Sequence, residues 1–280
     1  MSTTPHIPVA TPAAPDPMRR TARIAGVLYL LTFVSIPTLG LYAPVKDDVG
    51  AFLAGAGSDT GVMLGALSEV IVGLAGIGTA VVLFPVLKRQ NVTAALGIVA
   101  ARLLETSLIF VSVVSFLTVI TLRNDVAGTA GTDAAALSTT GHALVAAYTW
   151  TFLLSQSLMP VIVDLLLGYL LYRSGLVPRI LPLLAFVAAP LLLASDLAVF
   201  FGVYDNVSPL AVLAAFPIAV FEFSFGVYLV VKGFKPSSPL LNPPNTGIPS
   251  PTQVPASVLA PVPAPRAGDK AAGSLVGEAS

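Results

Sequence analysis

The sequence predicts an all-α membrane protein, a bundle of six transmembrane helices with both termini in the cytoplasm. The 280-residue chain is 55% hydrophobic and only 10% charged, whereas soluble domains carry about 25% charged residues. Its mean hydropathy is +0.89. Its apolar residues gather in six stretches, and each is long enough to cross a hydrocarbon core that about 20 helical residues span.

Composition also excludes several classes of function. Lys plus Arg balance Asp plus Glu at 14 each, so there is no basic excess for phosphate groups and we expect no nucleic-acid partner. The chain has no cysteine, which excludes disulfides and thiolate metal sites. His6 and His142 lie far apart in the sequence, too few for a histidine metal cluster. We therefore expect no metal, no cofactor and no enzymatic activity; an enzyme acting on lipid would need a nucleophile or metal that the sequence does not display.

Two proline-rich segments flank the apolar region. Residues 1–18 contain five prolines and residues 236–280 contain ten. Such segments bury too little apolar surface to offset the entropy lost on ordering. We expect disordered tails at both ends of a membrane domain at 19–235. The C-terminal tail is interpreted as a spacer, with the alternative that it binds a cytoplasmic partner.

The first three helices are expected at residues 24–42, 61–86 and about 92–122. The first apolar stretch follows Arg19, Arg20 and Arg23 as a signal peptide would, but it is too long for one, so we interpret it as a retained anchor. The second begins with a Gly-x-x-x-Gly motif at residues 61–65, a pattern that lets membrane helices pack closely.

The last three helices are expected at residues 142–172, 180–204 and 209–231. The fourth is long enough to tilt, kink or extend past the bilayer. The apolar runs are continuous, without the alternation of a barrel strand, which favours helices. Prolines inside membrane helices are tolerated where neighbours satisfy the freed carbonyls. Kinks are expected at Pro37, Pro160, Pro190 and Pro217.

Basic residues between the spans predict the orientation. Cytoplasmic loops of membrane proteins are enriched in Lys and Arg. One side of this chain collects Arg19, Arg20, Arg23, Lys88, Arg89, Arg173, Arg179, Lys232 and Lys235, against Lys46 and Arg123 on the other. We therefore expect a multi-pass protein of the cell membrane, surrounded by the lipid bilayer, with both termini inside.

Six ionisable residues lie within the predicted spans: Glu69, Arg102, Glu105, Asp164, Asp196 and Glu222. A charge at the centre of a membrane helix costs roughly 2.5–3.5 kcal/mol on insertion scales. Small residues recur at steps of three or four beside these side chains, so we expect them to face other helices rather than lipid.

Arg102 and Glu105 are spaced to form an ion pair on one helix. Arg102 could equally reach Glu222, which should lie at a similar depth near the midplane. These three residues form the predicted intramembrane polar site. Three further acids are expected to line access to it or to form secondary polar positions: Glu69, Asp164 and Asp196.

Two interpretations of these charges remain open. In the first, they form a path or pocket for an ion or small ligand, because charge inside a membrane marks function by default. In the second, they only hold helices together, and the protein is a non-enzymatic membrane scaffold or regulator.

Four segments resemble a bacterial membrane protein family. These are ARIAGVLYLL at 22–31, VAARLLE at 99–105, YRSGLVPR at 172–179, and FEF at 221–223 followed by KGF at 232–234. In this order and spacing they resemble the family called domain of unknown function 4386, over residues 18–235. The resemblance implies an integral membrane protein of six or seven helices in a bacterial cytoplasmic membrane. It implies no activity or cofactor, but it places Arg102, Glu105 and Glu222 within family-like motifs.

Overall fold

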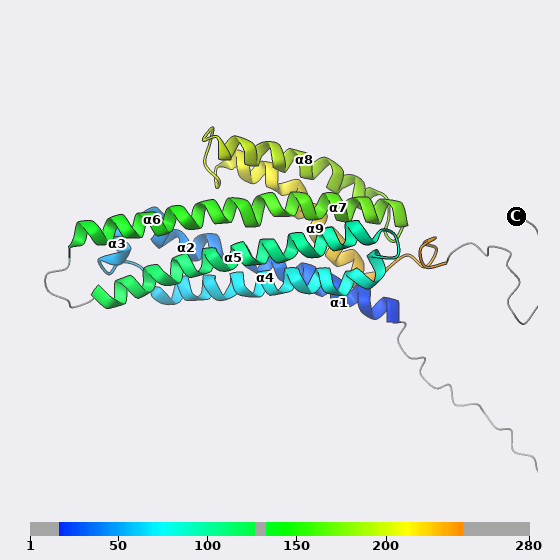
Figure 1. Ribbon diagram of the computed structural model, residues 1–280, viewed down its shortest axis with the longest axis horizontal. Helices are drawn as coiled ribbons and strands as arrows, with labels where there is room; N and C mark the ends of the chain where they lie inside the picture. Colours follow the sequence, from blue (N-terminus) through cyan, green and yellow to red (C-terminus); the bar gives the residue numbers. More distant parts are fainter. Residues whose placement is uncertain (1–16, 127–132, 243–280) are drawn as a thin grey trace, which may run out of the picture. The chain divides into compact units, whose positions relative to one another are not determined.

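The computed structural model describes residues 17–126 and 133–242. The chain divides into two units, residues 1–242 and 243–280, and the second unit lies outside the described ranges, as do most of the two predicted tails. The described residues form helices and no strands, and they include six helical segments long and apolar enough to cross a membrane (Figure 1). The predicted six-helix membrane fold is confirmed.

The first span is interrupted, which corrects the single helix expected at 24–42. Its pieces are α1 (Pro17–Leu31), the 3-10 turn η1 (Thr32–Ser35), α2 (Thr38–Asp47) and α3 (Val49–Leu53). Pro37 lacks a backbone N–H and cannot continue the hydrogen-bond ladder. The hydroxyls of Thr32, Ser35 and Thr38 instead donate to carbonyls three residues upstream, over 2.6–3.0 Å.

The remaining helices are α4 (Asp59–Leu87), α5 (Val92–Val126), α6 (Ala134–Phe152), the π-helical turn η2 (Leu153–Leu158), α7 (Met159–Ser174), α8 (Ile180–Phe200) and α9 (Pro209–Val231). Helix α5 extends beyond the expected residue 122, and α6 begins before 142. The Asp133 carboxylate accepts hydrogen bonds from the first N–H groups of α6, so the helix starts outside the apolar run. Helix α8 ends before the expected residue 204, because Gly202 adopts a left-handed conformation (φ 72°).

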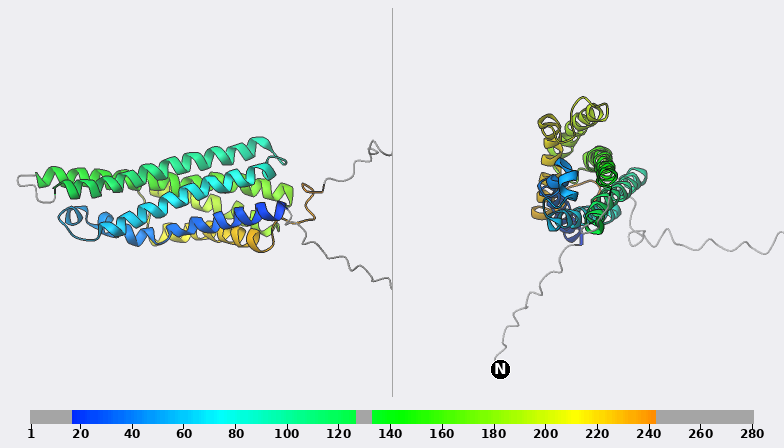
Figure 2. Two further views of the ribbon diagram at one scale, coloured as in Figure 1. Left: turned by 90° about the horizontal axis from the view of Figure 1, so that it is seen from below. Right: turned by 90° about the vertical axis from the view of Figure 1, so that its left-hand side faces the viewer.

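The helices alternate in direction and pack around α1, α4 and α5. Helix α1 lies between α4 and α9, α5 contacts α4, α6 and α7, and α8 contacts α7 and α9. Helices α8 and α9 lie away from α6 near the loop that connects α8 to α9 (Figures 1 and 2).

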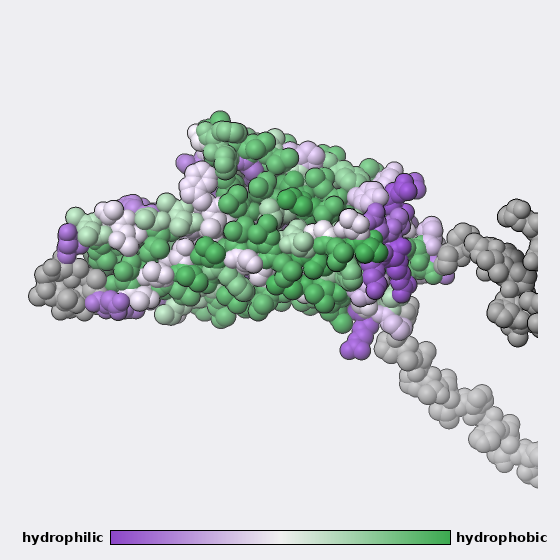
Figure 3. All heavy atoms as spheres, in the orientation of Figure 1, coloured by the Kyte–Doolittle hydropathy of each residue, from purple (hydrophilic) through white to green (hydrophobic). Residues whose placement is uncertain are grey.

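The surface fits a lipid environment. Hydrophobic residues cover most of the visible face of the helices, and hydrophilic residues gather near the end where α1 begins (Figure 3). Large apolar side chains such as Val187 and Leu213 are each 67% exposed. Apolar exposure on this scale marks a membrane-facing surface.

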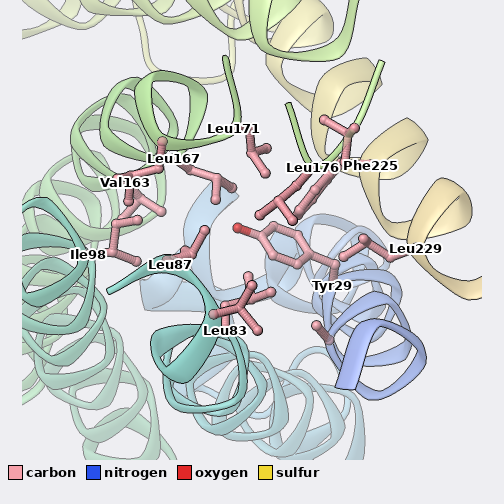
Figure 4. Packing of buried hydrophobic residues seen from close by; sticks show 14 of the residues in the cluster. Tyr29, Leu83, Leu87, Ile98, Val163, Leu167, Leu171, Leu176, Phe225 and Leu229 are labelled. Carbon is pink, nitrogen blue, oxygen red and sulfur yellow. The ribbon is translucent and has the colours of Figure 1, made fainter. Parts of the chain in front are cut away.

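The main apolar core lies near the basic end of the bundle. It joins Tyr29 of α1, Leu83 of α4, Leu167 of α7 and Phe225 of α9 (Figure 4). Tyr29 and Phe225 meet edge to face, with ring centroids 5.1 Å apart.

Residues 236–242, predicted as part of the C-terminal tail, are packed against the bundle. Ser238 is buried, and its hydroxyl donates to the Ser174 carbonyl over 2.7 Å. The Lys235 N–H donates to the Leu176 carbonyl over 2.8 Å. The packed region therefore extends past residue 235 to residue 242, because these bonds satisfy carbonyls at and just beyond the end of α7.

Close helix contacts depend on glycine. A Cβ placed on Gly26 would lie 2.6 Å from the carbonyl oxygen of Gly226, so α1 and α9 touch through their backbones. At Gly65, a Cβ would lie 2.6 Å from the Tyr42 ring. The predicted small-residue motif at 61–65 therefore makes room for a tyrosine of α2.

We expect Gly26→Ala to destabilise the protein by about 1–3 kcal/mol, the usual cost of overpacking, because the new methyl group would force α1 away from α9. Reversible unfolding in mixed micelles would measure the change. Gly40→Ala is the matched control, since no described atom outside its own helical surroundings lies within 4 Å of its Cβ position. An equal loss of stability in both variants would contradict the close contact.

Candidate functional site

Arg102 of α5 lies between two carboxylates. Its Nη1 donates to Glu105 Oε1 and Oε2 over 2.8 and 2.9 Å, and its Nη2 lies 3.5 Å from Glu222 Oε1 on α9. The guanidinium also lies 5.7 Å from the Tyr29 ring centroid, within range of a cation–π interaction. The two partners that the sequence left as alternatives for Arg102 are thus both engaged.

This Arg102–Glu105–Glu222 triad is largely withdrawn from solvent. Arg102 is 3% exposed and Glu105 is 6% exposed, whereas the Glu222 side chain is 17% exposed. On α4, Gly76 packs beside the arginine stem, with its Cβ position 3.6 Å from Arg102 Cδ. Four helices therefore meet at one buried cation.

The triad lines a cavity of about 230 Å³ between the helices. Its other polar lining comes from the two interrupted segments: Thr32 and Ser35 of η1, and Gln156 and Ser157 of η2. Irregular backbone at membrane depth occurs where protein or a water-filled cavity surrounds it. The breaks in the first and fourth spans therefore face the same cavity.

A second cavity of about 290 Å³ adjoins the first. The two share five lining residues: Gln156, Ser157, Leu192, Ala215 and Ala219. Asp196 and Asn206 also line the second cavity, and Asn206 lies in the loop between α8 and α9. The two cavities thus lie side by side between this loop and Glu222.

The η2 turn connects acids on two other helices. Gln156 Nε2 donates to Glu69 Oε1 on α4 over 3.1 Å, and the Ser157 hydroxyl donates to Asp196 Oδ1 on α8. Pro160 follows directly and has no N–H to donate within the helix. Single π-helical turns inside α-helices are frequent at functional sites. Gln156 was not among the residues predicted from the sequence, although it lies in a polar Ser-Gln-Ser run before a proline in an apolar span.

Glu69 is fully buried and lines neither cavity. Its carboxylate accepts hydrogen bonds from the Tyr42 hydroxyl (3.3 Å), the Tyr148 hydroxyl (3.1 Å) and Gln156. Phe116 stacks on Tyr148 with ring centroids 3.9 Å apart. Three donors and an aromatic cluster thus enclose Glu69 away from the two cavities, and its predicted role as an access or secondary polar position stays a prediction.

The other two acids differ in setting. Asp196 lines the second cavity, and its Oδ2 has no hydrogen-bond partner among the described residues. Asp164 is fully buried and lines neither cavity. It interacts electrostatically with Arg102, Glu105 and Glu222, so it belongs to the surroundings of the triad rather than to the access path.

The described residues contain no group of three or more His, Cys, Asp or Glu side chains that could hold a metal ion. The side chains of the site can instead supply charge and hydrogen bonds to a bound solute.

Comparison with known proteins gives one match. The family model described as Domain of unknown function (DUF4386) matches residues 24–233, from within α1 to just past α9. The matched range contains the triad and both interrupted spans. No curated protein and no solved structure matches the chain.

We expect Arg102→Met to cost about 3–5 kcal/mol of stability, since removing one partner leaves buried carboxylates without a cation. The double variant Arg102→Met/Glu105→Met should be more stable than the single variant, because one orphaned charge is gone. Unfolding in mixed micelles would measure both.

The control for this cycle is Arg123→Met. Arg123 pairs with Asp59 over 2.9 Å, but both side chains are partly exposed. The loss of stability in Arg123→Met should therefore be smaller than in Arg102→Met. Equal stability of the single and double Arg102 variants would contradict the expected cost of the orphaned Glu105 carboxylate.

Proposed function

The chain belongs to the DUF4386 family of integral membrane proteins, and on that premise we propose that it binds a small organic cation within its bundle and moves it across the membrane. One observation supports this most directly: two cavities with shared lining residues lie between the α8–α9 loop and the Arg102–Glu105–Glu222 triad. Binding sites of transporters typically lie near the midplane where helices are interrupted, as the first and fourth spans are here.

The charge of the cavity walls favours a cation. Arg102 is already engaged by Glu105 and Glu222, so an anion would have to compete with two carboxylates for it. Acceptors are more available: Asp196 Oδ2 has no partner among the described residues, and Glu222 is held only over 3.5 Å. A cation with N–H donors would satisfy either carboxylate.

The size of the cavities favours a small solute. Their volumes of about 230 and 290 Å³ lie below the roughly 300–1,000 Å³ of sites for drug-sized ligands. The proposal assigns binding roles to the carboxylates and the guanidinium, and it includes neither an enzymatic reaction nor a cofactor.

We place the protein in the bacterial cytoplasmic membrane with both termini inside. The start of α1, the junctions between α4 and α5 and between α7 and α8, and the end of α9 carry the nine basic residues of one side, against Lys46 and Arg123 on the other. In this orientation Asn206 and the second cavity face the outside.

The alternative is a membrane scaffold or regulator whose charges are structural. The three donors to Glu69 favour a structural role for that residue in particular. A cytoplasmic partner of the C-terminal tail would also favour this alternative, and that segment lies outside the described residues.

In proteoliposomes, we expect the full chain to take up radiolabelled guanidinium, which stays charged and has N–H donors, but not acetate. The double variant Glu105→Gln/Glu222→Gln should reduce uptake at least tenfold, because it removes the carboxylates around Arg102. The matched control is Glu69→Gln, which alters an acid outside the cavities and should keep its uptake. Undiminished flux in the double variant would refute the site.

A steric variant tests the path itself. Ala219 lines both cavities, so Ala219→Phe should reduce guanidinium uptake at least tenfold. Leu213→Phe on the same helix is the control, because this lipid-facing residue lines neither the first nor the second cavity. Equal uptake by Ala219→Phe and wild type would mean that the solute does not pass between these cavities.

A further inference from the structure

Asp164 is the one membrane acid whose carboxyl oxygens both lack a hydrogen-bond partner within residues 17–126 and 133–242. Its exposed fraction is 0%. Glu105 and Glu222 have Arg102, Glu69 has three donors, and Asp196 has Ser157. An ionised carboxylate withdrawn from water without a partner costs several kcal/mol, and carrying a proton avoids this cost.

The charged and titratable groups around Asp164 come from three other helices. Tyr29 of α1, Arg102 and Glu105 of α5, and Glu222 of α9 all interact with it electrostatically. Helix α7 adds no other ionisable side chain within a turn of Asp164. On α8, Asp196 accepts a hydrogen bond from Ser157, which lies about two turns before Asp164 in the sequence. Arg102 is thus the cation available to Asp164, and Glu105 and Glu222 compete for it.

The hydrogen bonding of Arg102 leaves its guanidinium able to change partners. Its contact with Glu222 is long, at 3.5 Å, and its Nε has no partner among the described residues. The Tyr29 ring offers a face over which the guanidinium can turn.

We propose that Asp164 is a proton-binding site that exchanges its proton for a cation bound at Glu222. With the cavity empty, Arg102 bonds Glu105 and Glu222, and Asp164 holds its proton. A cation at Glu222 displaces the guanidinium toward Asp164, which ionises and releases the proton. One proton leaves for each monovalent cation that enters, so the charge of the cluster stays constant. The exchange rests on the proposed function; the proton site rests on the surroundings of Asp164.

Infrared spectroscopy of the purified full chain tests the proton site without a ligand. We expect a carbonyl stretching band of a protonated carboxylic acid at neutral pH that is lost in Asp164→Asn. Asparagine has nearly the same shape, so this variant should remain folded, and Glu69→Gln should keep the band. If the spectra of the wild type and Asp164→Asn show no difference in such a band, the proton site is overturned, whether or not any cation binds.

Proton release tests the exchange. In weakly buffered detergent solution, a pH indicator should report about one proton released for each guanidinium bound by the wild type. Guanidinium keeps its own protons, so the released proton comes from the protein. Asp164→Asn should bind guanidinium without release. Wild-type binding without release would overturn the exchange alone. No binding would overturn the exchange together with the proposed function, and the infrared band would still decide the proton site.

Discussion

Arg102 is the buried cation around which this bundle is organised. A guanidinium withdrawn from water inside a membrane must be paired and hydrogen-bonded, because its desolvation costs several kcal/mol. Glu105 meets that demand from the same helix, and Glu222 contributes from α9. The Tyr29 ring of α1 and Gly76 of α4, which packs beside the arginine stem, complete the surroundings. Pairing one charge therefore fixes the mutual positions of four helices.

The same demand for partners accounts for the irregular backbone. In hydrocarbon, every backbone N–H and carbonyl must be satisfied by the protein itself or by water held in a cavity. The first and fourth spans are interrupted by η1 and η2, and both interruptions line the cavity that contains the triad. Hydroxyl and amide side chains accompany these turns. The polarity needed to tolerate a broken helix thus also gives the cavity a hydrophilic wall.

The six membrane charges fall into distinct environments rather than one ladder. Glu69 is enclosed by two tyrosines and Gln156, an arrangement suited to holding α2, α4 and α6 together. Glu222 and Asp196 face the cavities, where a solute can reach them. Asp164 lies behind the triad without a hydrogen-bond partner in the described part of the chain. Structural and functional interpretations of intramembrane charge therefore apply to different residues of one protein.

The sequence alone was sufficient to predict the six spans, because hydropathy along a chain depends only on the residues of each segment. It also predicted the Arg102–Glu105 pair, since the i, i+3 spacing brings the two side chains together on any helix. Only the tertiary structure decided what neighbouring helices contribute. The separation of Glu69 from the cavities, the link from Gln156 to Glu69 and the isolation of Asp164 all depend on contacts between helices distant in sequence. The break in the first span was also out of reach, because Pro37 predicts a disturbance but not whether the helix bends or divides. Periodicity assigns a residue to a face of its own helix, whereas packing determines which helix, cavity or lipid that face meets.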